Sequence, residues 1–152
     1  MRDVHIKFIP NNSQRYETIG DWFWDKRGNL QIRISQFPDE RHSLLVAIHE
    51  LFEAYAATRN KIPEPEVTKF DLWFEEESKA GRIPESLTEP GMHPKCPYNK
   101  EHQYATAIEM VLATLLGINW WEYDEAVTKM SREQKITERK VDDQGNGITE
   151  DA

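Results

Sequence analysis

The stretch of sequence that decides the fold is Leu44-Leu45-Val46-Ala47-Ile48-His49-Glu50-Leu51-Phe52-Glu53-Ala54-Tyr55-Ala56-Ala57. Eleven of these fourteen residues are apolar, and they occupy every side of a helical wheel. A helix that is apolar all the way round is typical of a protein interior. Pro38, Asp39 and Glu40 come just before it and form a helix-start signal, with acidic groups at the positive end of the helix dipole. We therefore predict a buried helix from about Glu40 to Arg59.

Three polar residues interrupt this apolar helix, and they share one arc of it. At 100° per residue, His49, Glu50 and Glu53 lie at about 0°, 100° and 40° on the wheel. His49 and Glu53 are four residues apart on one face, so both can bind a single ion, and Glu50 can reach a water on that ion. Such groups are costly to bury unless they are paired or bound to a metal. The alternative is a solvated helix face, with Glu53 paired with Arg59 or Lys61.

The segment from His49 to Glu53 matches the HExxH zinc motif with glutamate in place of the second histidine. A catalytic zinc takes three protein ligands and keeps one open position, so one more ligand is needed. A predicted helix at Lys100–Leu116 offers His102 and Glu109, which are two helical turns apart on one face. We expect His102 to be the third ligand, and Glu109 to orient a ligand imidazole or to bind the metal itself. The alternatives are an exposed His102 in the first helical turn and a buried ion pair between Glu109 and a lysine or arginine.

The remaining elements predict an α+β fold with a small antiparallel sheet followed by about four helices. Alternating residues predict a strand at Val4–Ile9, and a hairpin joins two β-rich runs at Asp21–Asp25 and Leu30–Ser35. Helices are expected at Pro65–Lys79, at Lys100–Leu116 capped by Asn99, and after Asn119, with a proline-rich loop at 82–98. Asp71, on the helix at 65–79, is a further candidate to approach the metal site, against the alternative of a solvated residue.

The composition limits the domain organisation and the classes of function. The chain has 152 residues, with 19 Lys and Arg against 27 Asp and Glu, for a net charge of −8. We predict one domain over residues 1–130 and a polar, disordered tail over 131–152. The negative charge argues against nucleic-acid binding. The single cysteine, Cys96, favours a reducing compartment, and no apolar run reaches 18 residues, so we expect a cytoplasmic protein outside the membrane.

Three segments of the chain resemble a known family. Residues 49–54 (His-Glu-Leu-Phe-Glu-Ala), 97–109 (Pro-Tyr-Asn-Lys-Glu-His-Gln-Tyr-Ala-Thr-Ala-Ile-Glu) and 116–120 (Leu-Gly-Ile-Asn-Trp) are similar to motifs of short zincin-like metallopeptidases encoded by phages and prophages. The resemblance covers roughly residues 20 to 125. The second histidine of HExxH is the point of departure, because glutamate stands there in this chain.

The resemblance implies a zincin-like fold, a catalytic zinc or another divalent metal, and hydrolysis of amide bonds in the cytoplasm of the host cell. It implies that Glu50 is the general base, and that a peptide or protein substrate is held by strand addition along Leu30–Ser35. Two other functions stay open on the sequence. One is a non-enzymatic phage accessory protein with at most a structural metal. The other is a protein-binding module that uses the acidic surface and the tryptophans.

Overall fold

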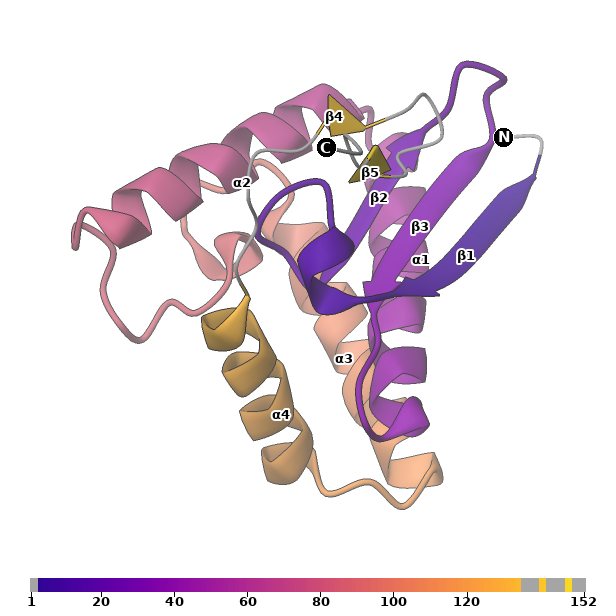
Figure 1. The fold of residues 1–152 in the computed structure, drawn as a ribbon, viewed down its shortest axis with the longest axis vertical. Helices are drawn as coiled ribbons and strands as arrows, with labels where there is room; N and C mark the ends of the chain where they lie inside the picture. The colour runs from indigo at the N-terminus through magenta and orange to yellow at the C-terminus, as the bar shows by residue number, and fades with distance from the viewer. Residues whose placement is uncertain (1–2, 135–139, 142–146, 149–152) are drawn as a thin grey trace.

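The computed structural model describes residues 3–134, 140–141 and 147–148, and these form an α+β fold in which four helices accompany a small three-stranded mixed sheet (Figure 1). In chain order the strands and helices are β1 (Val4–Ile9), β2 (Gly20–Trp24), β3 (Leu30–Ser35), α1 (Glu40–Arg59), α2 (Glu64–Lys79), α3 (Asn99–Leu115), α4 (Trp120–Glu133), β4 (Lys140–Val141) and β5 (Gly147–Ile148). Short 3₁₀ turns lie at Asn11–Ser13 and Pro90–Met92.

The sheet has the strand order β1-β3-β2. β2 and β3 pair as the predicted antiparallel hairpin, but β1 runs parallel to β3, so the expectation of a purely antiparallel sheet is wrong. The reason is topological. The connection at residues 10–19 reverses the chain after β1, the hairpin reverses it again, and β3 then inserts between the two earlier strands. Because β3 is paired on both edges, it cannot accept a further strand, so the predicted strand addition along Leu30–Ser35 is also wrong.

Both faces of β3 are buried. Its apolar residues Leu30, Ile32 and Ile34 belong to the hydrophobic core with residues of α1 such as Leu45 and Ala54. The opposite, polar face lies under the 10–19 connection. There the Gln14 side chain donates hydrogen bonds to the Ile19 carbonyl and to Ser35 Oγ. The apolar and polar residues of β3 therefore lie on opposite faces, and a loop covers the polar face.

Helix α1 has the predicted bounds, and Asp39 caps it by accepting a hydrogen bond from the Arg41 amide. It packs on β2, on β3 and along α3 (Figure 1). The prediction that α1 is buried on all sides is wrong, because these neighbours leave one stripe uncovered. Leu44, Leu51 and Tyr55 on this stripe are all exposed.

The ends of the other helices agree with the sequence apart from one cap. Asn119 caps α4, where its side chain accepts hydrogen bonds from the amides of Trp121 and Glu122. Asn99, by contrast, is the first residue inside α3 and does not cap it. Its side-chain amide donates to the Gly91 carbonyl, which fastens the proline-rich loop to the start of α3.

Most of the predicted tail at 131–152 lies outside the described residues. Within it, α4 continues to Glu133, and β4 pairs with β5 in antiparallel fashion. Among the described residues, no helix combines the length and the apolar composition that a membrane crossing requires.

Candidate metal centre

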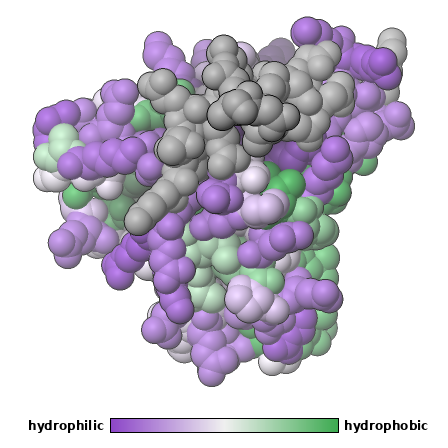
Figure 2. Space-filling model, in the orientation of Figure 1, coloured by the Kyte–Doolittle hydropathy of each residue, from purple (hydrophilic) through white to green (hydrophobic). Residues whose placement is uncertain are grey.

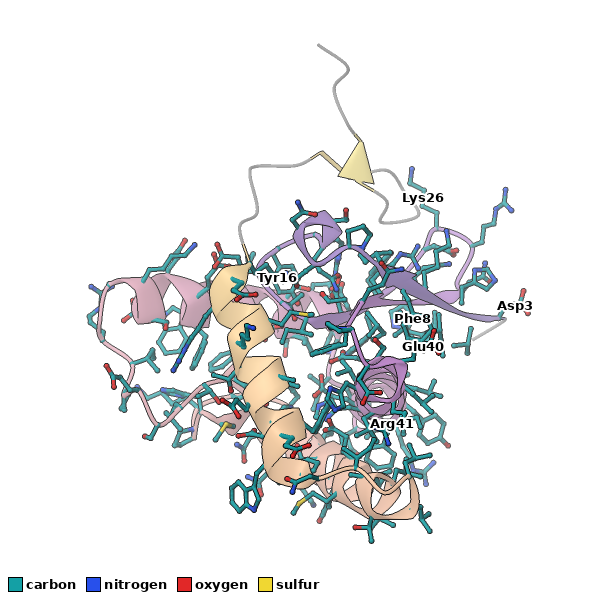
Figure 3. All side chains as sticks on the ribbon, turned by 60° about the horizontal axis from the view of Figure 1, so that its bottom comes forward. Asp3, Phe8, Tyr16, Lys26, Glu40 and Arg41 are labelled. Atoms are coloured by element: carbon teal, nitrogen blue, oxygen red, sulfur yellow. The ribbon has the colours of Figure 1, made fainter. Side chains whose placement is uncertain are left out.

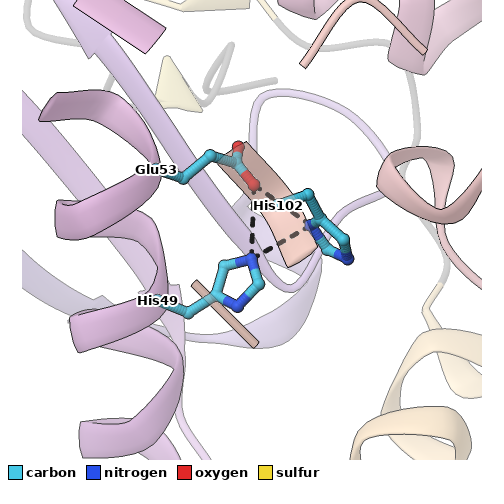
Figure 4. A group of neighbouring side chains, drawn as sticks. All are labelled: His49, Glu53 and His102. Atoms are coloured by element: carbon cyan, nitrogen blue, oxygen red, sulfur yellow. Dashed lines mark hydrogen bonds and ion pairs between the residues drawn. The ribbon is translucent and has the colours of Figure 1, made fainter. Parts of the chain in front are cut away.

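Three side chains that are far apart in the sequence converge at one point between α1 and α3 (Figure 4). His49 Nε2 lies 3.2 Å from Glu53 Oε2 and 3.1 Å from His102 Nδ1, and His102 Nδ1 lies 3.1 Å from Glu53 Oε2. All three residues are buried. The structure thus brings together the residues predicted as ligands. The alternatives of a solvated face around Glu53 and an exposed His102 are wrong.

The triangle of donor atoms has the size of a zinc site. A tetrahedral zinc with bonds of about 2.1 Å needs donor atoms roughly 3.4 Å apart. The edges here are 3.1, 3.1 and 3.2 Å, so each would lengthen by about 0.2 to 0.3 Å around such an ion. Within the described part of the chain, this is the one group of three or more potential ligands with such close spacing.

Each imidazole is held by a carboxylate on the nitrogen that points away from the centre. His49 Nδ1 lies 2.6 Å from Glu109 Oε2, and His102 Nε2 lies 3.0 Å from Glu89 Oε2. The Tyr123 hydroxyl in turn donates a hydrogen bond to Glu109. Histidines that bind metals usually have such a partner, which fixes the ring and makes the inner nitrogen a better ligand. Glu109 therefore contacts His49 and Tyr123, and not the lysine or arginine considered as an alternative.

The contacts with Glu109 and Glu89 determine which ring nitrogens of the two histidines carry protons. A carboxylate can only accept, so the outer nitrogens of His49 and His102 carry protons. In neutral rings, the inner nitrogens then present lone pairs to each other and to the carboxylate oxygen of Glu53. Three converging acceptors repel one another unless a cation or protons lie between them. The arrangement could therefore hold a metal ion.

Protons and a metal ion compete for this position. Burial lowers the pKa of His102, but hydrogen bonds to Glu53 and Glu89 outweigh it and raise the pKa to about 9. The pKa of His49 is likewise raised above its ordinary value, since hydrogen bonds to Glu109 and Glu53 outweigh burial. Two imidazolium rings and one divalent cation between neutral rings supply the same charge of +2 to the three carboxylates. A divalent ion can therefore replace the two protons without changing the charge balance.

Glu53 is fixed by a further contact that the sequence did not indicate. Trp22 Nε1 on β2 donates a hydrogen bond of 3.2 Å to Glu53 Oε1, the oxygen that does not face the two histidines. Trp22 is buried in the core. Oε1 of Glu53 is thus occupied by this hydrogen bond, and Oε2 is the one oxygen of the carboxylate that can act as a metal ligand at the centre.

Glu50 lies one residue from a ligand and lines the cleft beside the centre. It is half-buried. Burial and the nearby charge of Glu53 raise its pKa well above the ordinary value. A carboxylate with a raised pKa beside a metal site has the properties of a general base. Gly20 makes room for it, because a Cβ at that position would lie 2.5 Å from Glu50 Oε1.

Asp71 does not reach the metal ligands. Its carboxylate accepts hydrogen bonds from the hydroxyls of Tyr16, at 2.7 Å, and Tyr98. Burial outweighs these bonds and raises its pKa to about 7. Asp71 does line the same cleft as Glu50, so it belongs to the surroundings of the centre rather than to its ligand set.

The proline-rich loop contributes two residues that sequence reasoning missed. Glu89 holds His102, and Gly91 lies directly against the His102 ring, where an added Cβ would be 2.6 Å from Cδ2 and closer still to Cγ and Nδ1. Neither residue has a fixed spacing to the motif on α1. The one local signal is Pro90-Gly91 itself, a turn dipeptide that places a residue without a side chain within the loop.

The three potential ligands and Glu50 lie in the wall of a cleft of about 1460 Å³. Its other walls come from β2, α2, the 82–92 part of the loop and α4. The centre is thus closed on the sides of α1 and α3 by protein and borders open space on another side. That is the arrangement expected where a metal keeps a position for a substrate or water.

No protein-family model matches this chain, and neither a curated protein nor a solved structure is similar enough to count as a match.

Proposed function

We propose that this protein is a zinc-dependent metallopeptidase, or an amide hydrolase of the same type. The observation that supports it most is the convergence of His49 Nε2, Glu53 Oε2 and His102 Nδ1 on one point, with carboxylates on both outer imidazole nitrogens. Two histidines and one glutamate are a ligand set that catalytic zinc sites use. The zincin-like metallopeptidase resemblance of the motif segments agrees with this proposal and is part of it.

The residues around the centre have separate roles in the proposed reaction. When bound, zinc supplies Lewis acidity for a substrate carbonyl and lowers the pKa of water. Glu50 accepts a proton from the attacking water and passes it to the amide nitrogen that leaves. Glu109 and Glu89 keep the two imidazoles in the orientation and tautomer that a metal requires. Trp22 does the same for the carboxylate of Glu53.

A peptide or protein substrate fits the position of the cleft. β2 is an edge strand of the sheet, and Gly20 and Trp22 on it line the cleft beside the metal ligands. We infer that an extended substrate lies along β2, rather than along the central strand β3. Strand addition to an edge gives main-chain hydrogen bonds that do not depend on the substrate sequence.

The experiment compares metal content and turnover in matched variants. Glu50→Gln keeps the shape of the side chain but removes the base, so zinc binds in a 1:1 ratio while cleavage of a fluorogenic peptide mixture falls by about 100-fold or more. His49→Ala loses both zinc and cleavage. Glu125→Gln, an exposed carboxylate on α4, is the control and keeps both.

Two results would contradict the proposal in different ways. If the folded protein takes up no divalent ion, then the metal site itself is refuted. If zinc binds but wild type and Glu50→Gln are equally inactive over a broad peptide set, the metal has a structural role in a non-enzymatic protein.

A further inference from the structure

The side of the molecule opposite the metal centre carries an uncovered apolar surface built by α1, α3 and β1. Figure 2 shows hydrophobic residues gathered along the side of the molecule that α1 and α3 occupy in Figure 1. We call this surface the apolar face. It does not involve the cleft or any residue of the proposed reaction.

The part of the apolar face on α1 is a stripe of Leu44, Leu51 and Tyr55, which are 42%, 36% and 56% exposed. Residues seven and four apart lie on one side of a helix. At 100° per residue, Leu51 points about 160° away from both His49 and Glu53. The stripe therefore faces away from the metal centre.

Helix α3 continues the same surface. Tyr104, Val111 and Leu115 repeat the spacing of seven and four and are 54%, 62% and 76% exposed. Val111 lies about 180° from the ligand His102 on the helical wheel. Because the ligands of α1 and α3 converge at one point between the two helices, both stripes face away from that point, on the outside of the helix pair.

The third part comes from β1, the edge strand that α1 does not cover. Val4, Ile6 and Phe8 pair in register with Leu30, Ile32 and Ile34, so they extend the face of the sheet that packs on the helices. α1 packs on β2 and β3 instead, and the three β1 side chains are therefore exposed. Figure 3 shows Phe8 on the same side of the molecule as Glu40 and Arg41, at the start of α1.

We propose that the protein forms a twofold-symmetric dimer through the apolar face, with α1 of one copy packed antiparallel on α1 of the other. Taken together over the three elements, the nine exposed side chains present on the order of 800 Å² of surface. A stable interface buries about 800 Å² on each partner, so the surface has the size that a dimer needs.

The charges around the apolar face favour a second copy as the occupant. α1 begins at Glu40, whose preceding residue Asp39 is ion-paired with Arg41 of the same turn, and it ends in Arg59. In an antiparallel pair, Glu40 of each helix lies near Arg59 of the other. The two antiparallel helix dipoles also attract each other. Between Leu44 and Tyr55 the stripe itself carries no charge, which gives the apolar centre and charged rim of protein interfaces.

The same charges disfavour a membrane as the occupant. Surfaces that bind anionic lipid carry an excess of Lys and Arg beside their apolar residues. Here the rim has both signs, and the whole chain has a net charge of −8.

The test is the mass in solution of the 152-residue chain, measured by sedimentation velocity from 1 to 100 µM. We expect wild type at twice the monomer mass at 10 µM, and Leu51→Glu as a monomer at that concentration. Leu72→Glu changes a leucine of similar exposure on α2, away from the apolar face, and is expected to remain dimeric. Leu115→Glu serves as a second variant, because a residue that is three-quarters exposed can be changed without loss of folding.

A cysteine pair tests the helix orientation. In the variant with both Glu40→Cys and Arg59→Cys, mild oxidation is expected to link two chains covalently, whereas Glu40→Cys alone is not. Wild type that stays monomeric at 100 µM, or a dimer that survives both Leu51→Glu and Leu115→Glu, would overturn the proposal. A monomer that binds uncharged phosphatidylcholine vesicles through Leu51 would overturn it in favour of a membrane surface.

Discussion

Replacing Gly91 by alanine tests whether the loop positions the ligand His102. An alanine Cβ would lie 2.6 Å from His102 Cδ2, and closer to the ligand atom Nδ1. Ordinary contact between such atoms begins near 3.4 Å, so the ring or the loop must move by about 1 Å. Zinc sites tolerate deviations of only about 0.2 Å in their ligand distances. We therefore expect the zinc affinity of Gly91→Ala to fall by about 100-fold or more.

This loss has a measurable thermal consequence. At a zinc concentration 100 times the wild-type Kd, binding stabilises the wild-type fold by about 2.7 kcal/mol, whereas a variant with 100-fold weaker affinity gains only about 0.4 kcal/mol. For a chain of this size, that corresponds to a zinc-induced rise in Tm of roughly 5–10 °C for wild type and about 1 °C for the variant.

The assay is thermal unfolding followed by circular dichroism, with and without zinc, together with competition against a chromophoric chelator. Gly81→Ala is the control, because its positive φ makes alanine unfavourable there although no atom lies within 4 Å of the new Cβ. It is expected to lower the Tm without zinc but to keep the full zinc-induced rise. If Gly91→Ala is folded and binds zinc as wild type does, the proposed positioning of His102 by the loop is refuted.

Three further predictions concern protons and contacts around the centre. The pKa of His102 is about 9 in the metal-free fold, so zinc binding must release protons. The zinc affinity should therefore rise at least about 10-fold per pH unit from pH 6.5 to 8.5. A zinc affinity that does not change with pH in titration calorimetry would contradict this. The raised pKa of Asp71, about 7, means that the contribution of Asp71 to stability falls as pH rises from about 4 to 7. Asp71→Asn should remove this contribution, about 1–3 kcal/mol, from the pH dependence of urea unfolding; the same pH dependence in wild type and variant would count against it. Trp22→Phe loses the hydrogen bond to Glu53 and should weaken zinc binding about 10-fold in chelator competition. Trp121→Phe changes an exposed tryptophan and should leave the zinc affinity unchanged. Equal zinc affinities of wild type and Trp22→Phe would show that Glu53 does not need this hydrogen bond.

The local part of the site was predictable from the sequence. The bounds of α1 follow from its start signal and apolar run, and the i, i+4 spacing places His49 and Glu53 on one side of it. His102 could be proposed because it lies on a second helix with one amphipathic face. These are short-range patterns, in which backbone geometry alone determines which side chains share a face.

The other features of the fold and the site depend on contacts between distant segments, which the hydrophobic periodicity of the sequence does not reveal. The parallel pairing of β1 depends on where the hairpin inserts, and the exposure of Leu51 depends on how much of α1 its neighbours can cover. Glu89 and Gly91 act through a loop whose path is fixed by the Asn99 side chain, a residue that the sequence suggested as a helix cap. Such residues become visible only when the fold places them against the centre.

The most direct test of the proposed metal site is X-ray absorption at the zinc edge on the zinc-loaded, 152-residue chain. The proposed site predicts nitrogen and oxygen neighbours at about 2.0–2.1 Å, outer-shell scattering from two imidazoles and no sulfur. His102→Ala should remove one imidazole from that spectrum. A sulfur neighbour near 2.3 Å from Cys96, or a spectrum that does not change in His102→Ala, would contradict it.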